Sequence, residues 1–599
     1  MVGGPKRGGG GIVAESYSRP TVKSSVIFRR LWNYLSMYKW WFALALLLST
    51  VSNLIALVGP KLSGYAIDAI EPGPGNVDFK TVFVYTSLML VLYIISSLLS
   101  YLLALLMVYI SRRIVRQMRS DLFKKLTTLP VGFFDTVQTG EVISIFSYDI
   151  DTINASLSND ILQMFTSIVT VVGSFIMMVS ISPKLVLIFV VTIPASIIFT
   201  QYRSKKVRPL FRRRSAKLGE LNGFIEEMTA GHKTIKAYNQ EDVVLEKFEH
   251  QNEESADAYF RADCFASMTG PAVSFINNLS LALISVFGAG LYMAGSMGLG
   301  GVSSFIMYSR KFSGPINEFA NILSDLQSAM AAAERVFRLL DLESEKPDAP
   351  DAHALSEITG NVDFNGVGFA YVPGNDILNN FSLKADHGNV VAIVGPTGAG
   401  KTTVINLLMR FYDADRGVIS IDGHDITTVT RKSLRSAFTM VLQDTWMFYG
   451  TIYENIAYGK DGITMEEVQA AAKAAKIHNF IMSLPDGYNT ILSDNAVNIS
   501  KGQKQLLTIA RSILLDTEIL ILDEATSNVD TQTEKKIQSA MLKLMKDKTC
   551  FVIAHRLSTI QNADLIIVMQ AGDIAESGTH EQLLARGGFY AELYNSQFN

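Results

Sequence analysis

The sequence offers little for disulfide bonding, metal binding by cysteine or nucleic-acid recognition. Its 599 residues include two cysteines, Cys264 and Cys550, which are too far apart in the chain to indicate a disulfide framework or a metal site. No group of histidines and cysteines has the spacing of zinc ligands. The formal net charge of −3 gives no case for a nucleic-acid partner. Residues 1–25 are rich in glycine and lack the apolar core of a signal peptide, so we expect a disordered tail there.

The chain does have an excess of apolar residues in long runs without charge. Hydrophobic residues make up 48% of the sequence and the mean hydropathy is +0.23, both high for a soluble protein. Because a helix needs about 20 apolar residues to cross a bilayer, these runs predict transmembrane helices. The last run has a glycine-rich turn at residues 295–301 and is long enough for two spans, which makes six. The runs are residues 40–60, 81–111, 161–183, 185–202 and 264–309.

Basic residues mark one side of the predicted membrane. Six Lys and Arg residues lie in residues 112–125, after the second run, and seven lie in residues 203–214, after the fourth. The loops on the opposite side contain almost none. The positive-inside rule therefore places both termini in the cytosol, as in a multi-pass protein of the cytoplasmic membrane. An amphipathic segment at residues 26–39 predicts a helix at the membrane interface, so the predicted transmembrane domain covers residues 26–340.

The two basic loops, residues 112–160 and 203–263, have helical periodicity rather than the composition of linkers. We expect spans two to five to continue through them as helices, with turns at residues 133–140 and 230–237. Each of these tips either transmits force from a cytosolic domain or is a simple helix break, and the sequence favours neither interpretation.

Polar side chains inside the apolar runs also have two interpretations. They line a path for a substrate, or they form hydrogen bonds between helices, and we favour the second. The residues concerned are Asn53, Gln163, Asn277 and Asn278.

The composition changes after residue 340. An acidic, proline-bearing stretch at residues 341–356 is typical of a linker between domains. Over residues 357–599, β-branched runs alternate with helical ones, which predicts an α/β domain. The predicted fold is therefore multidomain, with an all-α, six-helix transmembrane domain followed by an α/β domain.

A glycine-rich motif at residues 395–402 indicates what the α/β domain binds. It fits the phosphate-binding pattern G-x-x-x-x-G-K-[ST], and it stands between a strand-like run at residues 389–394 and a helical run at residues 403–410. Glycines let backbone N–H groups surround phosphate oxygens at a helix N-terminus. Lys401 is expected to reach the β- and γ-phosphates of ATP, and Thr402 is expected to ligate Mg²⁺. The predicted contact residues are Gly395, Pro396, Thr397, Gly398, Ala399, Gly400, Lys401, Thr402 and Thr403.

Two adjacent carboxylates follow a second strand-like run. Residues 519–522 are all apolar and predict a buried strand, with Asp523 and Glu524 at its carboxyl end. Ligands bind at that edge of such sheets. Asp523 is expected to hold Mg²⁺, directly or through water, and Glu524 is expected to polarise the water that attacks the γ-phosphate.

Three further side chains complete the predicted site. His555 ends an apolar run and could contact the γ-phosphate, while Gln443 could approach Mg²⁺ and the attacking water. Tyr371 precedes the glycine-rich motif by about two dozen residues, and its ring could stack on adenine. A single residue of any of these types at a strand end usually has a structural role. Each of these three assignments therefore depends on the other predicted site residues.

A second motif connects these residues with a known family. Ile499-Ser500-Lys501-Gly502-Gln503 resembles the signature LSGGQ of ABC ATPases. The predicted strand with its two acids, a D-loop-like stretch that ends at Asp530, and a switch histidine then follow in the order of that family. Six spans fused before such a domain resemble a half-transporter of the ABC exporter family. The resemblance covers nearly the whole chain after the N-terminal tail.

The resemblance implies an ATP hydrolase coupled to transport. In that family two nucleotide-binding domains pair head to tail, and ATP with Mg²⁺ lies between the P-loop of one and the signature of the other, so a second chain completes each site. The favoured cargo is an amphipathic, drug-like molecule that crosses the lipid bilayer. The alternative is a lipid or lipid-linked compound, which would make the protein a flippase. A nucleotide-gated channel or sensor is disfavoured because Glu524 suits repeated turnover.

Two departures from the family pattern concern the partner chain. Lys501 stands where the family has glycine, and a side chain there hinders the close approach of the backbone to phosphate. Residues 493–498 lack the family's usual contact loop before the signature. This is similar to one chain of the heterodimeric exporters, which have one hydrolysing and one degenerate site. We therefore favour a heterodimer, in which Glu524 serves the active site, over a homodimer that tolerates Lys501.

Overall fold

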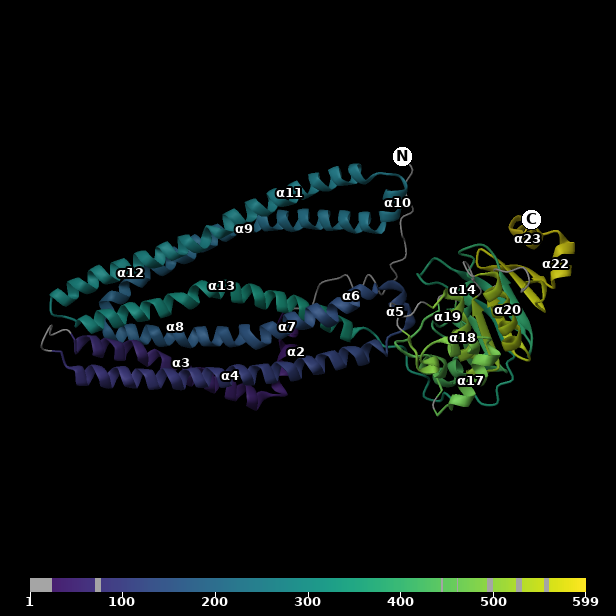
Figure 1. Ribbon diagram of the computed structural model, residues 1–599, viewed down its shortest axis with the longest axis horizontal. Helices are drawn as coiled ribbons and strands as arrows, with labels where there is room; N and C mark the ends of the chain where they lie inside the picture. The colour runs from purple at the N-terminus through teal and green to yellow at the C-terminus, as the bar shows by residue number, and fades with distance from the viewer. Residues whose placement is uncertain are drawn as a thin grey trace. The chain divides into compact units, whose positions relative to one another are not determined.

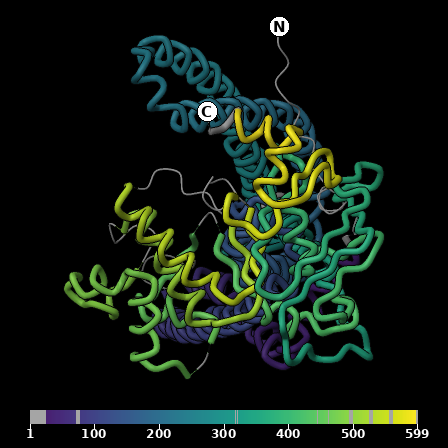
Figure 2. Tube along the Cα trace, turned by 90° about the vertical axis from the view of Figure 1, so that its right-hand side faces the viewer, coloured from purple at the N-terminus to yellow at the C-terminus, as the bar shows by residue number. Residues whose placement is uncertain are grey.

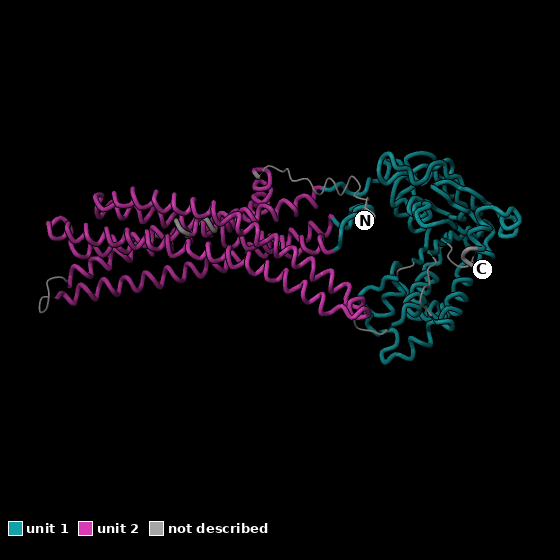
Figure 3. Tube along the Cα trace, turned by 90° about the horizontal axis from the view of Figure 1, so that it is seen from above, with its two compact units in different colours: residues 1–20, 126–139, 342–599 teal, residues 21–125, 140–341 magenta. Residues whose placement is uncertain are grey.

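The chain divides into two compact units, which Figure 3 shows in different colours. One unit comprises residues 21–125 and 140–341, and the other comprises residues 1–20, 126–139 and 342–599. A computed structural model describes residues 24–70, 77–442, 445–460, 462–492, 499–523, 530–553 and 560–598.

The described part of the first unit consists of helices joined by short turns (Figure 1). The segment predicted to lie at the membrane interface forms α2, and the predicted glycine turn separates α12 from α13. Both basic loops are helical, as the periodicity predicts, because α4 and α9 continue well beyond their uncharged runs. The helices are α2 (Ser24–Ser36), α3 (Lys39–Asp68), α4 (Phe79–Leu126), α6 (Thr139–Ser144), η1 (Ile145–Asp149), α7 (Ile150–Ala155), η2 (Ser156–Asp160), α8 (Ile161–Ile181), α9 (Pro183–Ala230), α10 (His232–Ala237), α11 (Glu241–Ser267), α12 (Thr269–Met293) and α13 (Leu299–Asp341).

Five helical stretches in the described part of the chain are long and apolar enough to cross a membrane. The sixth predicted span, in α13, is not among them, because Arg310 and Lys311 follow its apolar first turns. The five stretches are Lys39–Asp68, Phe79–Leu126, Thr139–Ile181, Pro183–Ala230 and Glu241–Met293. Residues 1–23 lie outside the described ranges, so the disordered tail stays a prediction.

Close packing of α3 against α13 holds the first unit together at one end. A Cβ atom added to Gly300 would stand 1.9 Å from the backbone oxygen of Gly64, so the two helices touch through glycine. The Gly300 N–H donates to the Asp68 carboxylate at 2.7 Å, and the Ser304 hydroxyl donates to the Pro60 carbonyl at 2.8 Å. Small residues let helix backbones approach in this way within membranes.

The polar residues inside the spans contribute to helix packing where their bonds are described. Asn53 of α3 accepts a hydrogen bond from the Thr170 hydroxyl of α8 at 3.3 Å. The Gln163 amide of α8 donates to the Glu318 carboxylate of α13 at 3.0 Å. These contacts support the helix-packing interpretation for both residues, whereas for Asn277 and Asn278 it stays a prediction.

The second unit contains the predicted α/β domain, and Figure 2 shows its green and yellow segments from a second direction. Its strands are β1 (Val362–Phe369), β2 (Leu378–Ala385), β3 (Val390–Val394), β4 (Arg416–Ile421), β5 (His424–Asp425), β6 (Phe438–Val441), β7 (Gly450–Thr451), β8 (Ile491–Leu492), β9 (Ile519–Asp523), β10 (Thr549–Ile553), β11 (Leu565–Gln570) and β12 (Asp573–Gly578). Its helices are α5 (Val131–Thr136), α14 (Lys401–Leu408), α15 (Arg431–Ser436), α16 (Ile452–Ala457), α17 (Met465–Ala474), α18 (His478–Ser483), η3 (Gly487–Asn489), α19 (Lys501–Leu515), α20 (Thr531–Met545), α22 (His580–Arg586) and α23 (Phe589–Phe598).

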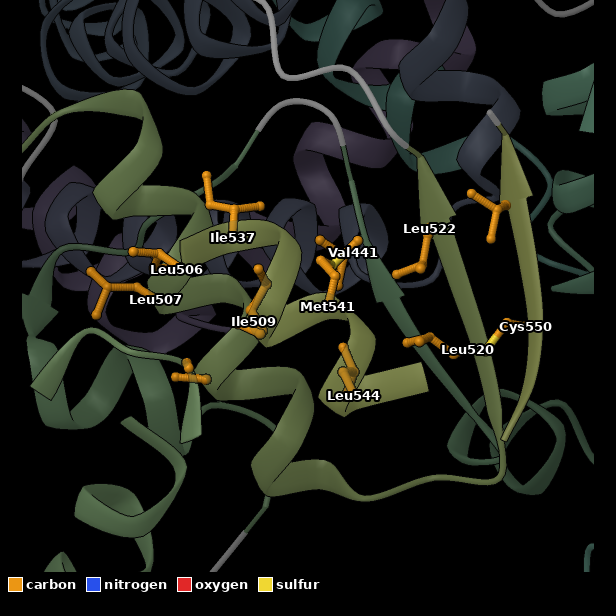
Figure 4. Close-up of a cluster of buried hydrophobic side chains, with 14 of the residues drawn as sticks. Val441, Leu506, Leu507, Ile509, Leu520, Leu522, Ile537, Met541, Leu544 and Cys550 are labelled. Atoms are coloured by element: carbon orange, nitrogen blue, oxygen red, sulfur yellow. The ribbon is translucent and has the colours of Figure 1, made fainter. Parts of the chain in front are cut away.

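A six-stranded sheet in the order β12-β11-β3-β10-β9-β6 forms the centre of this unit. All its neighbouring strands are parallel except β11 and β12. Alternate residues of a strand face opposite sides of the sheet. Thus Ile519 and Ile521 pack in one buried cluster with α14, while Leu520 and Leu522 pack in the other with α19 and α20 (Figure 4). Burial on both faces explains why the strands are continuously apolar.

The predicted linker begins where α13 ends, and it is bound to the second unit by charge. Arg435 of α15 holds the Glu345 carboxylate with both terminal nitrogens. The Arg431 side chain, 9% exposed, pairs with Asp348 at 3.1 Å. The acidic residues that suggest a linker in the sequence are therefore partners for two arginines of the α/β domain.

We predict that Gly300→Ala destabilises the first unit by about 1–3 kcal/mol, since the new methyl group meets the α3 backbone. The measurement is thermal unfolding of the purified protein in detergent. Gly290→Ala in α12 is the matched control, because nothing lies within 4 Å of a Cβ atom there. Equal unfolding temperatures for the two variants would contradict the prediction.

Candidate functional site

The glycine-rich motif forms the predicted turn between β3 and α14. Gly395 has φ +153°, and a Cβ atom on it would stand 2.4 Å from the Met569 carbonyl oxygen of the neighbouring strand β11, so only glycine fits. Gly400 precedes the first turn of α14, whose backbone N–H groups are free to bind an anion. The turn therefore has the backbone geometry that phosphate binding requires.

Lys401 lies over this turn. Its ammonium group donates to the carbonyl oxygens of Gly395 at 2.8 Å and Pro396 at 2.9 Å. Partial burial lowers the pKa of Lys401, and the negative charge of Asp523 opposes that shift. The electrostatic interaction with Asp523 follows from the sheet order, since β3 and β9 both pair with β10 and end at the same edge.

The three predicted catalytic residues, Gln443, Glu524 and His555, lie outside the described residues. The strands that lead to them are described. The parallel strands β6, β9 and β10 end at Val441, Asp523 and Ile553, and they lie side by side in the sheet next to β3. The sheet thus brings the ends of four strands to the edge where the glycine-rich turn lies.

Tyr371 stands beside α14, with its hydroxyl bonded to two residues of that helix. Its hydroxyl donates to the Thr403 hydroxyl at 3.3 Å and accepts from the Asn406 amide at 3.1 Å. The side chain is 40% exposed, and Phe369 and Tyr412 hold its ring edge-on from two sides. The adenine-stacking role stays a prediction.

Tyr412 is a site residue that the sequence does not reveal. Its ring centroid lies 5.0 Å from that of Tyr371, and its hydroxyl donates to the Asp135 carboxylate of α5 at 2.6 Å. Burial and this acceptor raise the pKa of Tyr412. Helix α5 overlaps the first predicted tip, residues 133–140, and the contact ties it to the α/β domain, while a force-transmitting role for that tip stays a prediction. No motif marks a tyrosine that pairs with a residue 277 positions away.

The signature-like segment begins a helix. The Ser500 hydroxyl accepts from the Gln503 N–H at 3.2 Å, and the Gln503 side chain accepts from the Ser500 N–H at 2.9 Å. This capping box places Lys501 in the exposed first position of α19 and buries Gly502. Residues 493–498 lie outside the described ranges.

Asp530 also caps a helix. Its carboxylate accepts from the Thr533 N–H at 2.9 Å at the start of α20, and this bond lowers the pKa of Asp530. Asp530, which the sequence assigns to the D-loop, thus stabilises the N-terminus of α20. Any role toward a partner chain stays a prediction.

The described side chains fit Mg²⁺. Thr402 lies in the first turn of α14 and Asp523 ends β9, and hydroxyl and carboxylate oxygens are ligands that this ion takes. The edge of the sheet thus combines an anion-binding turn, a lysine and an acid, which together suit a nucleoside triphosphate with its metal ion.

Comparison with known proteins agrees with this geometry. Residues 42–316 match the family model of the ABC transporter transmembrane region, and residues 378–527 match that of the ABC transporter. The chain belongs to the ABC transporter family. It couples ATP hydrolysis to transport, and it combines a helical transmembrane domain with an α/β ATPase domain.

Individual relatives cover nearly the whole chain. A fatty acid ABC transporter ATP-binding/permease protein of Mycobacterium bovis is 44% identical over 88% of this chain and 83% of its own length. An ATP-dependent lipid A-core flippase of Salmonella typhimurium is 33% identical over 95% of this chain and 98% of its own length. The solved structure of a bacterial Atm1-family ABC exporter with ATP bound matches with a TM-score of 0.75 and 30% identity, over 96% of this chain and 99% of that one.

We predict that Tyr371→Ala weakens ATP binding about tenfold, since stacking of a base on an aromatic ring contributes about 1–3 kcal/mol. Calorimetric titration with a non-hydrolysable ATP analogue measures the effect. Tyr371→Phe is the matched control, because it keeps the ring and loses only the bonds to Thr403 and Asn406. Equal loss in both variants would assign the effect to those hydrogen bonds instead of to stacking.

Proposed function

We propose that this chain is one half of an ATP-driven exporter in the cytoplasmic membrane, with both termini and the ATPase domain in the cytosol. The observation that carries the proposal is the glycine-rich turn at the end of β3, with Lys401 above it and Asp523 on the same edge. The five long apolar stretches of the first unit provide the membrane part, and α13 is the sixth span.

Within the ATP site, side chains and backbone N–H groups of this chain bind the phosphates and Mg²⁺ and position the attacking water. Backbone N–H groups of the turn and the Lys401 ammonium bind the phosphates, while Thr402 and Asp523 hold Mg²⁺, which neutralises phosphate charge when bound. Glu524 polarises the attacking water, and Gln443 and His555 orient the water and the γ-phosphate. Closure of two such domains around ATP is passed to the spans through α5, which Tyr412 anchors.

The partner is a second, non-identical half-transporter. The capping box begins α19 at Lys501, which is exposed. In the family arrangement this end faces the phosphates of the other chain's nucleotide, where a lysine side chain replaces the close backbone approach that glycine permits. The partner's own P-loop site is then the impaired one. A homodimer that tolerates Lys501 is the alternative.

The cargo is an amphipathic molecule with an acyl chain. Both cargo classes expected from the sequence, drug-like and lipid-like, suit uncharged spans. The relatives named for a fatty acid and for lipid A favour the lipid class. Transport of a labelled fatty acid and of a cationic dye into proteoliposomes separates the two, and uptake of the dye alone would reject the lipid cargo.

We predict that Lys501→Gly raises the ATPase rate of this chain, purified without a partner, on the order of tenfold, because the backbone regains access to phosphate. Adding Glu524→Gln must remove the gained rate, which shows that it comes from this site. If the unaltered chain alone turns over as fast as the complex from native membranes, the heterodimer is wrong.

We further predict that Glu524→Gln in the native complex lowers ATP hydrolysis about 100-fold or more while ATP binding persists. The substitution keeps the size of the side chain and removes the carboxylate that polarises water. Phosphate release and nucleotide binding are measured on the same sample. Continued hydrolysis at the original rate would reject Glu524 as the catalytic carboxylate.

A further inference from the structure

A proline in α3 leaves one backbone carbonyl without its helical partner. Pro60 has no N–H, so it cannot donate to the Ala56 carbonyl one turn earlier. The Lys311 ammonium of α13 donates to that carbonyl instead, at 2.9 Å. The next carbonyl, that of Leu57, accepts from the Tyr308 hydroxyl at 2.5 Å. Side chains of α13 thus satisfy the part of α3 that the proline opens.

A lysine in this position lies deep in the membrane. Ala56 precedes the end of α3 at Asp68 by 12 residues, about 18 Å along the helix axis. The apolar core of a bilayer is about 30 Å thick, so the ammonium lies within it. Charged side chains at such depth are costly; they usually pair with one another or with backbone carbonyls, and they mark pathways of substrates or ions.

No carboxylate neutralises Lys311 among the residues that the structure describes. It is absent from every salt bridge there, and the Glu318 carboxylate on the same helix bonds the Gln163 amide instead. An ammonium group has three N–H donors, and the Ala56 carbonyl takes one. The bond to α3 therefore uses only one of the three N–H donors of the Lys311 ammonium.

A cavity of about 990 Å³ begins one helical turn from Lys311. Pro315, four residues further along α13, lines it, and its other walls are α8, α9 and α12. Its walls are apolar, with hydroxyl and amide groups but no charged side chain. The Ser167 hydroxyl belongs to the wall and has no hydrogen-bond partner among the described residues, although Ser167 is only 4% exposed. The cavity thus suits an apolar chain with a polar group beside it.

We propose that Lys311 and this cavity bind an amphiphile with an anionic head group, a carboxylate or a phosphate, with its acyl chain in the cavity. The inference rests on the proposed export function and specifies the charge of its cargo. The flexible four-carbon stem of Lys311 lets the ammonium turn toward the cavity while the head group takes its unused donors. The anion also neutralises the cation within the membrane, which gives acids an advantage over neutral esters of the same length.

The test measures binding without nucleotide, in the full complex held in nanodiscs of phosphatidylcholine. A fluorescent hexadecanoic acid is the probe, and empty nanodiscs give the background. Palmitate, hexadecyl phosphate, methyl palmitate and hexadecylamine compete for it. We expect the two anions to bind about tenfold more tightly than the ester, because a hydrogen bond to a charged group adds on that order. The amine is expected to bind most weakly.

Variants distinguish the effect of the positive charge of Lys311 from that of its hydrogen bond to the Ala56 carbonyl. Lys311→Gln keeps a donor for the Ala56 carbonyl and removes the charge, and it is expected to abolish the preference for anions. Lys311→Arg is expected to retain it. Lys61→Gln, which removes an exposed cation of α3, is the matched control and is expected to leave the preference unchanged.

Equal binding of acid and ester by the unaltered complex would overturn the proposal, and this comparison needs no variant to fold. A Lys311→Gln protein that still prefers acids would overturn it as well. Palmitate binding without hexadecyl phosphate binding would restrict the head group to a carboxylate. Because binding is measured without ATP, a failure of export with an intact preference for anions would reject only the proposed function.

Discussion

The parallel pairing of β3, β10 and β9 is the constraint on which the site depends. These strands are buried on both faces, so their side chains are apolar until the point where each strand ends. Polar residues are available only at that edge. The close approach of Gly395 to the Met569 carbonyl then fixes the turn after β3, and the strand order brings Lys401 within electrostatic range of Asp523 at the same edge.

The second unit holds more than the chain's C-terminal half. Helix α5, far away in sequence, joins it through the bond between Tyr412 and Asp135, and Tyr412 also supports the ring of Tyr371. A single tyrosine thus connects the predicted base-stacking residue with the tip of a helical hairpin. These contacts are ring packing and a charge-assisted hydrogen bond, so the three side chains form one continuous set within this unit.

In the first unit, the membrane imposes a different requirement. Every backbone polar group in the apolar core needs a partner within the protein. The proline in α3 removes one helical N–H donor, and the side chains of Tyr308 and Lys311 in α13 donate to the α3 carbonyls there instead. The Lys311 ammonium thereby brings a positive charge among the membrane-spanning helices, and its bond to α3 is the reason for its position there.

The sequence alone determined the order of domains, five of the six predicted spans, the glycine-rich turn and the place of Asp523 at a strand end. These follow from local regularities: hydrophobic period, run length, and residue spacing that one turn or one strand imposes. The capping box of Ser500 and Gln503 was not predicted, although it is also local, since both residues lie within one helical turn. Only the tertiary structure decided that Tyr412 meets Asp135, that Arg431 and Arg435 hold the linker, and that Lys311 completes α3. Those partners are tens to hundreds of residues apart, and no local pattern encodes a contact that arises when separate helices and strands pack against each other.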